Sequence, residues 1–200
     1  MKWAWLGLFS GVLLWSGIAP FDRMTWALEV APAIVGLGLI IVSYRRFLLT
    51  PLLYWLILAH AVVLMIGGHY TYALVPIGDW FSHLFDLERN NYDKLGHFMQ
   101  GFVPAILARE ILIRQGVVST PGWRNFLIVS ICLAFSAFYE LIEWWVALVS
   151  GEAAEAFLGT QGDIWDTQSD MGMALVGAIS ALMLLGTFHD RQLDRLSRAP

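Results

Sequence analysis

The chain has 200 residues, of which 58% are hydrophobic and 14% are charged, and its formal net charge is −4 at pH 7. A soluble domain carries roughly a quarter charged residues, so this composition excludes an ordinary soluble domain. The sequence also lacks the basic stripe of a nucleic-acid-binding protein. The composition predicts an integral membrane protein.

Six apolar stretches come close to the ~20 residues that a membrane-spanning helix needs. In chain order they cover residues 3–18, 26–44, 52–68, 93–113, 126–149 and 167–188. Lys2 and the small residues near Ala19 are features of a signal peptide, but Pro20 and five further spans favour an uncleaved anchor. We therefore expect an all-α integral membrane protein, with one six-helix transmembrane domain over residues 1–188 and a short basic cytoplasmic tail over residues 189–200.

The Lys and Arg residues predict how these helices are oriented. Nine of the twelve fall on one side when the helix ends are assigned alternately to the two sides. The positive-inside rule then puts both termini in the cytoplasm of a bacterial inner-membrane protein. The outer connections are the longest, with an aromatic-rich stretch at residues 79–85 that suits the membrane interface and a Gly-rich, acidic stretch at residues 150–166. We expect the working surface to be the outer face.

Acids and histidines lie inside or at the edges of the apolar stretches, where an ionised group costs at least ~2.5–3.5 kcal/mol. Asp93 and His97 are four residues apart, and Glu140 and Glu143 are three apart, so each pair shares one helix face. The remaining members open the last stretch or close the third one, and they are Asp163, Asp166, Asp170 and His69. Such residues indicate a functional site.

The depths of these residues in the membrane also agree. At a rise of 1.5 Å per residue, His97 lies roughly 6 Å below the outer start of its helix, and Asp170 lies about 5 Å inside its own. Glu143 and Glu140 lie roughly 9–14 Å below the outer end of theirs. We therefore expect side chains from four helices to form one shallow, outward-facing polar site.

The aspartates have structural interpretations as well. Residues 167–170 fit a helix capping box, and Asp163 or Asp166 could be the N-cap of the last helix. Asp93 could cap the fourth helix or pair with Lys94. These alternatives stay open at the level of sequence.

The histidines and glutamates differ in how well a structural role explains them. His69 could simply be an interfacial residue, and His60 and His83 are interpreted as structural. No basic residue is expected at the depth of Glu140 and Glu143. These two carboxyl groups therefore need a cation, shared protons or water.

Carboxylates combined with imidazole, without a thiolate nearby, suit Mg²⁺, Mn²⁺, Fe²⁺ or Zn²⁺. Cys132, the single cysteine, lies within a span and is interpreted as an apolar filler. The candidate ligands of a divalent metal ion are His97, Glu140, Glu143, Asp170, Asp166, Asp93 and His69. The candidate catalytic residues are His97, Glu140 and Glu143. Asp93 is expected to orient His97, and Asp166 and His69 are expected to be peripheral.

Three functions are compatible with such a site. A metal ion could activate water for hydrolysis or transfer on a lipid-linked envelope substrate, because the site would lie near headgroup depth. A proton or cation transporter or relay would use the same residue types, although the polar stripes do not continue into the cytoplasmic half. A non-catalytic envelope assembly or resistance factor would use the polar layer to join helices or to dock a periplasmic partner.

Haem is a further alternative as a cofactor, because His69 and His97 both lie near the outer face. The surrounding acids favour a metal ion or a proton relay instead. The expected partners are the lipid bilayer and a lipid-linked or periplasmic small molecule, with no nucleic acid. The sequence does not indicate an oligomeric state.

Four motifs carry a resemblance to a known family. They are GHYTY at 68–72, YDKLGHF at 92–98, FYELIEW at 138–144 and GTQGDIWDTQSDM at 159–171. In these motifs the chain resembles the YjdF-like family of bacterial inner-membrane proteins, a domain of unknown function, over nearly its whole length. The resemblance implies the membrane class and groups these residues together, but it implies no reaction or cofactor.

A second resemblance is more distant and rests on few residues. The chain is similar to VanZ-like proteins at Asp93, Lys94, His97, Phe98, Glu140, Asp166 and Asp170. This similarity implies a role in the cell envelope and in resistance to glycopeptide antibiotics of the teicoplanin type.

Overall fold

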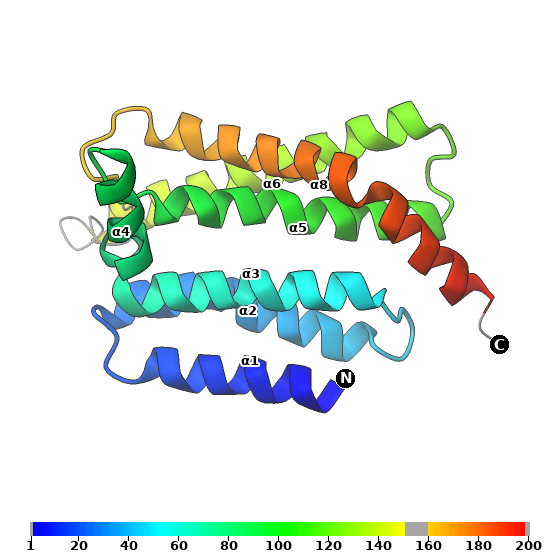
Figure 1. Cartoon of the computed structure of the whole chain (residues 1–200), viewed down its shortest axis with the longest axis horizontal. Helices are drawn as coiled ribbons and strands as arrows, with labels where there is room; N and C mark the ends of the chain where they lie inside the picture. Colours follow the sequence, from blue (N-terminus) through cyan, green and yellow to red (C-terminus); the bar gives the residue numbers. More distant parts are fainter. Residues whose placement is uncertain (1, 151–159, 199–200) are drawn as a thin grey trace.

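A computed structural model describes residues 2–150 and 160–198, so most of the predicted Gly-rich connection lies outside the described residues. The helices are α1 (Lys2–Gly17), α2 (Arg23–Ser43), α3 (Pro51–Tyr70), the 3-10 helix η1 (Tyr72–Leu74), α4 (Pro76–Phe85), α5 (Tyr92–Arg114), α6 (Pro121–Ser150) and α8 (Asp166–Ser197). The helices α1, α2, α3, α5, α6 and α8 run along the long axis, and α4 lies across one end (Figure 1). At the opposite end of the bundle, α1 begins and α8 ends.

In the part of the chain that the structure describes, four helices are long and apolar enough to cross a membrane, namely α2, α3, α6 and α8. The helix α1 has only 16 residues. Charged residues near both ends lower the hydropathy of α5, among them Asp93, Lys94, Arg109 and Glu110. The described residues contain no strand. The prediction of an all-α membrane protein is confirmed, whereas length and hydropathy identify four spans and not six.

Helices α2 and α3 begin at side-chain caps. Asp22 Oδ1 accepts a hydrogen bond from the Thr25 backbone N–H at 2.7 Å, and this bond lowers the pKa of Asp22. Thr50 caps α3, and Pro51 at the first helical position supplies the dihedral angle that a helix start requires. One apolar core then joins all the long helices and includes Cys132, which is fully buried there.

Helix α5 packs most extensively against α8. Two glycines allow this contact, because a Cβ atom on Gly101 would overlap the carbonyl group of Ala174, and one on Gly177 would overlap that of Phe98. Small residues at such positions let membrane helices approach backbone to backbone. The close contact brings the acidic start of α8 alongside the polar face of α5.

A buried polar network joins α5 to α8 and to the start of α3 at the end of the bundle away from α4. Glu110 is fully buried and accepts hydrogen bonds from Thr50 Oγ1 at 2.7 Å, His189 Nε2 at 3.0 Å and Arg114 Nη1 at 2.8 Å. Arg109 Nη1 lies 3.0 Å from His189 Nδ1. Since arginine can only donate, Nδ1 is the acceptor. The proton of the ring is therefore on Nε2, which donates the hydrogen bond to Glu110. The sequence pattern gave no indication of this network.

Helix α8 is also longer than the apolar pattern predicts. That pattern ends at residue 188, but the helix continues to Ser197. His189 is fully buried on this extension. Gln192 Oε1 accepts a hydrogen bond from the backbone N–H of Leu52 at 2.9 Å. Most of the expected tail therefore continues the last helix and packs against the start of α3.

The short helix α4 lies across the other end of the bundle (Figure 1). It exposes a row of large apolar side chains, which are Ile77, Trp80, Phe81, Leu84 and Phe85. Asn90 fixes α4 to the bundle, since its Nδ2 donates to the Val75 carbonyl at 3.0 Å and to Asp79 Oδ1 at 2.7 Å. A helix with this exposed face suits the membrane interface.

Candidate functional site

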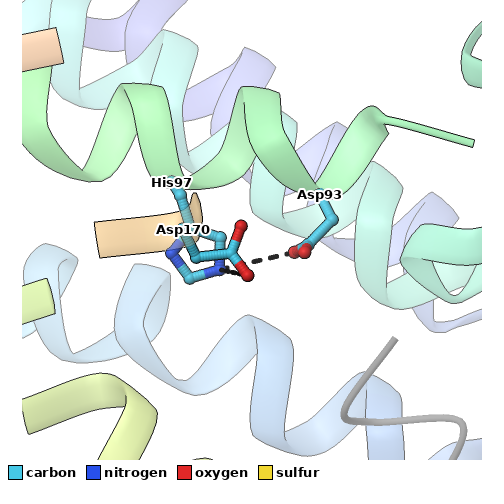
Figure 2. Close-up of side chains that lie close together, drawn as sticks. All are labelled: Asp93, His97 and Asp170. Carbon is cyan, nitrogen blue, oxygen red and sulfur yellow. Dashed lines mark ion pairs between the residues drawn. The ribbon is translucent and has the colours of Figure 1, made fainter. Parts of the chain in front are cut away.

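His97 lies at the centre of the polar cluster and comes from the second turn of α5. Its Nε2 atom is 3.4 Å from Asp93 Oδ1, one turn earlier on the same helix, and 3.9 Å from Asp170 Oδ2 on α8. Figure 2 shows the two carboxylates on the same side of the imidazole ring. One ligand atom from each residue lies within 4.8 Å of the other two. The close contact of α5 and α8 is what brings the three together.

This arrangement fits a divalent metal ion. His97 Nδ1 lies 3.0 Å from Gln100 Oε1. An amide oxygen can only accept, so Nδ1 carries a proton, and in the neutral ring Nε2 then has the lone pair that a metal ion requires. Histidine ligands of metals are commonly fixed in this way by a partner on the other nitrogen. Zinc bonds of about 2.0–2.1 Å in a tetrahedron separate the ligand atoms by roughly 3.4 Å, which is the distance from His97 Nε2 to Asp93 Oδ1, while Asp170 Oδ2 lies 3.9 Å from Nε2.

Lys94 holds two of the acids of α8. Its Nζ atom donates hydrogen bonds to Asp166 Oδ1 and to Asp170 Oδ1, both at 2.8 Å. The expected alternative of a pair between Lys94 and Asp93 is therefore wrong. One oxygen of Asp170 is bound by Lys94, while the other faces His97.

Arg89 precedes α5 and contacts the same region. Its Nη1 atom donates to Asp166 Oδ1 at 2.7 Å and to Asp163 Oδ2 at 3.2 Å. The N-cap residue of α8 is Trp165, and no side chain caps this end. The interpretation of Asp166 as a helix cap is therefore wrong, because its carboxylate binds the two cations instead.

The cluster contains more buried acids than permanent cations. Six acidic residues are at most 9% exposed, namely Glu29, Asp93, Glu140, Glu143, Asp166 and Asp170. Arg89 and Lys94 are the two permanently charged bases bonded to them. Buried charges that lack partners are strongly unfavourable. The remaining carboxyl groups therefore need a metal ion, protons or water.

A polar cavity of about 80 Å³ lies beside His97. It is lined by Glu29, Pro32, His60, Leu64, Tyr72, Asp93, Gly96, His97, Gln100, Tyr139 and Glu143. Side chains from α2, α3, η1, α5 and α6 thus meet in one space. The volume holds a few water molecules or a small polar group.

Glu140 lies next to this cavity on α6. Its Oε1 atom is 3.8 Å from His97 Nδ1 and has no hydrogen-bond partner among the described residues. The buried hydroxyl of Ser136, one turn earlier on the same face, also lacks one. Buried polar atoms are nearly always paired, so these two mark a place for a proton, an ion or water.

Comparison with known proteins decides the family. The family model described as "Predicted membrane protein (DUF2238)" matches residues 1–191. The chain belongs to this family. Among curated proteins, it is 53% identical to the inner membrane protein YjdF of Escherichia coli (strain K12) over 184 residues, which are 92% of this chain and 88% of that protein. No solved structure matches the chain.

These findings confirm the predicted YjdF-like family and the location. The chain is a multi-pass protein of the inner membrane, because its relative is an inner membrane protein and four helices are able to span a bilayer. The similarity to VanZ-like proteins stays a prediction. The names of the family and of the relative assign no reaction.

The cavity contains residues that the sequence patterns did not single out. Glu29 on α2 is 4% exposed, and its Oε2 atom accepts a hydrogen bond from the Tyr139 hydroxyl at 3.4 Å. Tyr72 reaches the cavity from η1, just after Thr71, whose φ of 58° is uncommon for a residue other than glycine. The sequence pattern could have identified Glu29, since it is an acid within an apolar stretch.

His69 is a candidate ligand whose contacts lie elsewhere, on α1. Its ring packs against that of Trp15, with the centroids 4.6 Å apart, and Nδ1 lies 3.0 Å from the carbonyl oxygen of Ser16. It is not among the residues that line the cavity. His69 therefore joins α3 to α1.

Proposed function

We propose that this protein is a divalent-metal-dependent hydrolase or transferase that acts on the polar part of a lipid-linked substrate of the cell envelope. The observation that supports this best is the position of His97 Nε2, which faces the carboxylates of Asp93 and Asp170 beside a polar cavity. The surplus of buried acids needs a metal ion, protons or water at the same place, and a metal ion meets this need. An inner-membrane location gives the site direct access to lipid-linked molecules.

In this proposal Asp93, His97 and Asp170 hold the metal ion. Asp93 is then a ligand and does more than orient His97, which Gln100 orients through Nδ1. Lys94 keeps Asp170 ionised and in place by binding its other oxygen. These assignments follow the preference of Mg²⁺, Mn²⁺ and Zn²⁺ for oxygen and imidazole ligands.

Glu143 and Glu140 handle protons in this proposal. A divalent cation held there would polarise the substrate oxygen and make water a better nucleophile. In hydrolysis the water oxygen bonds to phosphorus or to the carbonyl carbon, and the ester or amide bond to the leaving group breaks. Glu143, which lines the cavity, accepts the proton from water, and the leaving group gains a proton in return. In transfer, an acceptor hydroxyl takes the place of water.

The distribution of polar groups argues against the transporter alternative. Along α5, each residue from Gly101 to Ala108 is apolar, and this stretch separates Gln100 from the network around Glu110. The polar cavity ends at Gln100 and His60. A proton or cation pathway needs polar groups along the whole membrane thickness. A site that is polar at one end only favours chemistry at that end.

Metal content tests the proposal. Purified wild-type protein is expected to contain about one divalent metal ion per chain by elemental analysis, since residues 2–150 and 160–198 contain one such group of three ligands. His97→Gln is expected to lose the ion, with metal affinity falling by more than the ~10–100-fold that follows loss of an orienting partner. A wild type without metal under any divalent-metal supplement contradicts the proposal.

His83→Gln is the matched control for this measurement. His83 is exposed on α4 and lies outside the cluster, so this variant should keep its metal. Circular dichroism and gel filtration of both variants separate loss of the metal from loss of the fold. Retention of the metal by both variants would show that the ion is bound elsewhere.

We infer a six-span topology with both termini in the cytoplasm. Helices α1 and α5 run beside the four apolar helices (Figure 1), although α1 is short and α5 is polar near both ends. The start of α1 and the end of α8 lie at one end of the bundle, which suits an even number of crossings. The Lys and Arg distribution favours a cytoplasmic location for that end, with α4 and the polar site outside.

Cysteine labelling tests this topology. Glu88 follows α4 and Arg195 lies near the end of α8, and both are exposed. In a Cys132→Ala background, Glu88→Cys is expected to react with a membrane-impermeant maleimide in intact cells, whereas Arg195→Cys should react only after the inner membrane is opened. Labelling of both from the same side would contradict this topology, which places three spans, α5, α6 and α8, between the two positions.

A further inference from the structure

An apolar groove of about 510 Å³ runs between α2, α3 and α5. Small residues shape its surface, among them Ala33 and Gly36 on α2 and Ala61 on α3. On α5, Val103 and Leu107 complete the lining. The volume lies within the ~300–1,000 Å³ of typical ligand sites, and the lining offers few hydrogen-bonding groups. The groove therefore suits a hydrocarbon ligand.

The groove adjoins the polar cavity. Pro32, His60 and Leu64 line both spaces. Beyond these three residues, one space contains the acids around His97 and the other is almost wholly apolar. Together they form a site with a polar end and a long apolar end, which is the shape of an amphiphile.

The length of the groove limits the kind of chain that fits. From Val103 to Gln115, both of which line the groove, α5 rises by ~18 Å at 1.5 Å per residue. From His97 to Gln115 the rise is ~27 Å, nearly the ~30 Å thickness of the hydrocarbon core. A chain that starts at the polar cavity and fills the groove is therefore longer than one leaflet is thick.

We propose that the groove binds a single long hydrocarbon chain of a membrane lipid, whose polar head enters the cavity beside His97. Where it names the substrate class of the enzyme, this inference rests on the proposed function. Binding of the chain itself depends only on the groove. The head then lies next to Glu143 and His97, at the place of the proposed chemistry.

Gly36 allows a direct test. A Cβ atom at this position would meet nothing within 4 Å, so Gly36→Trp places its indole in the groove without a backbone clash. Gly38→Trp is the matched control, because a Cβ atom there also meets open space and residue 38 does not line the groove. Both changes add the same side chain to the same helix.

Native mass spectrometry measures the lipid that each purified variant retains from two probes, dipalmitoyl phosphatidylethanolamine and a long-chain polyisoprenyl phosphate. Wild type and Gly38→Trp are expected to retain one polyisoprenyl phosphate per chain. Retention by Gly36→Trp should fall at least about tenfold, which corresponds to about two CH₂ groups left unburied. Retention of the phospholipid instead would make an ordinary acyl chain the occupant and overturn the long-chain assignment.

Equal retention by all three proteins would mean lipid on the outer surface only, and it would overturn the groove as a binding site. Metal analysis of the same samples separates this inference from the proposed function. If lipid retention depends on Gly36 but the protein contains no metal, the groove is supported as a lipid site and the proposed metal centre is contradicted. If the protein contains metal but its lipid retention does not depend on Gly36, the metal centre is supported and the groove is contradicted as a lipid site.

Discussion

Replacing Glu110 with alanine is expected to lower the free energy of unfolding by about 3–5 kcal/mol, the cost of removing one partner from a buried ion pair. Glu110 is fully buried and accepts hydrogen bonds from Thr50, His189 and Arg114. Its removal leaves Thr50 Oγ1 and His189 Nε2 without this acceptor in a place that water does not reach, whereas Arg114 still donates to the Leu48 carbonyl. The network joins α5 to α8 and to the start of α3, so the loss weakens three elements at once.

Asp190→Ala is the matched control for this prediction. Asp190 accepts a hydrogen bond from Arg109 at 2.7 Å in the same region, but its side chain is 55% exposed. An exposed pair of this kind contributes ~0–1 kcal/mol. Unfolding in mixed micelles, followed by circular dichroism, compares the two variants. A similar, small loss in both would mean that Glu110 is hydrated or neutral in the folded protein.

The sequence could predict which end of the bundle carries the polar site. Spacings of three and four residues put Asp93 with His97, and Glu140 with Glu143, on single helix faces, and buried polar faces in a membrane protein turn towards one another. The structure brings His97 within 4 Å of Asp93, Asp170 and Glu140. Helix periodicity alone was sufficient for this part.

The pairing of charges could not be predicted in the same way. Lys94 is adjacent to Asp93 in sequence, but its side chain points to Asp166 and Asp170 on α8. Neighbouring residues on a helix point in different directions, so which acid a lysine reaches depends on the helix packed against it. That information comes from the α5–α8 contact.

The network around Glu110 could not be predicted from the sequence either, and the reason is different. Glu110 and His189 are 79 residues apart in sequence. Both lie near expected cytoplasmic ends of spans, where charged residues are ordinary. Glu29, in contrast, obeys the same rule that identified Glu140, namely an acid within an apolar stretch. It belongs to the set that sequence alone was able to define.

Replacing Gly177 with valine is expected to destabilise the protein by about 3 kcal/mol, the upper end of the usual cost of overpacking. The first added atom would overlap the Phe98 carbonyl group, and a backbone group cannot rotate away as a side chain can. Helices α5 and α8 would have to separate. Asp170 lies two turns before Gly177 on the same face of α8, so the separation would also move its carboxylate away from His97.

Gly177→Val should therefore lose metal as well as stability, although it changes no ligand. Gly186→Val is the control, because a Cβ atom at position 186 on the same helix meets nothing within 4 Å. Both variants carry the small cost of a β-branched residue in a helix, and only the first affects the α5–α8 contact. If Gly177→Val remained folded and bound metal as tightly as Gly186→Val, the group formed by Asp93, His97 and Asp170 could not be the metal site. The close approach of two helices at their glycines is thus the step by which the sequence builds the candidate site.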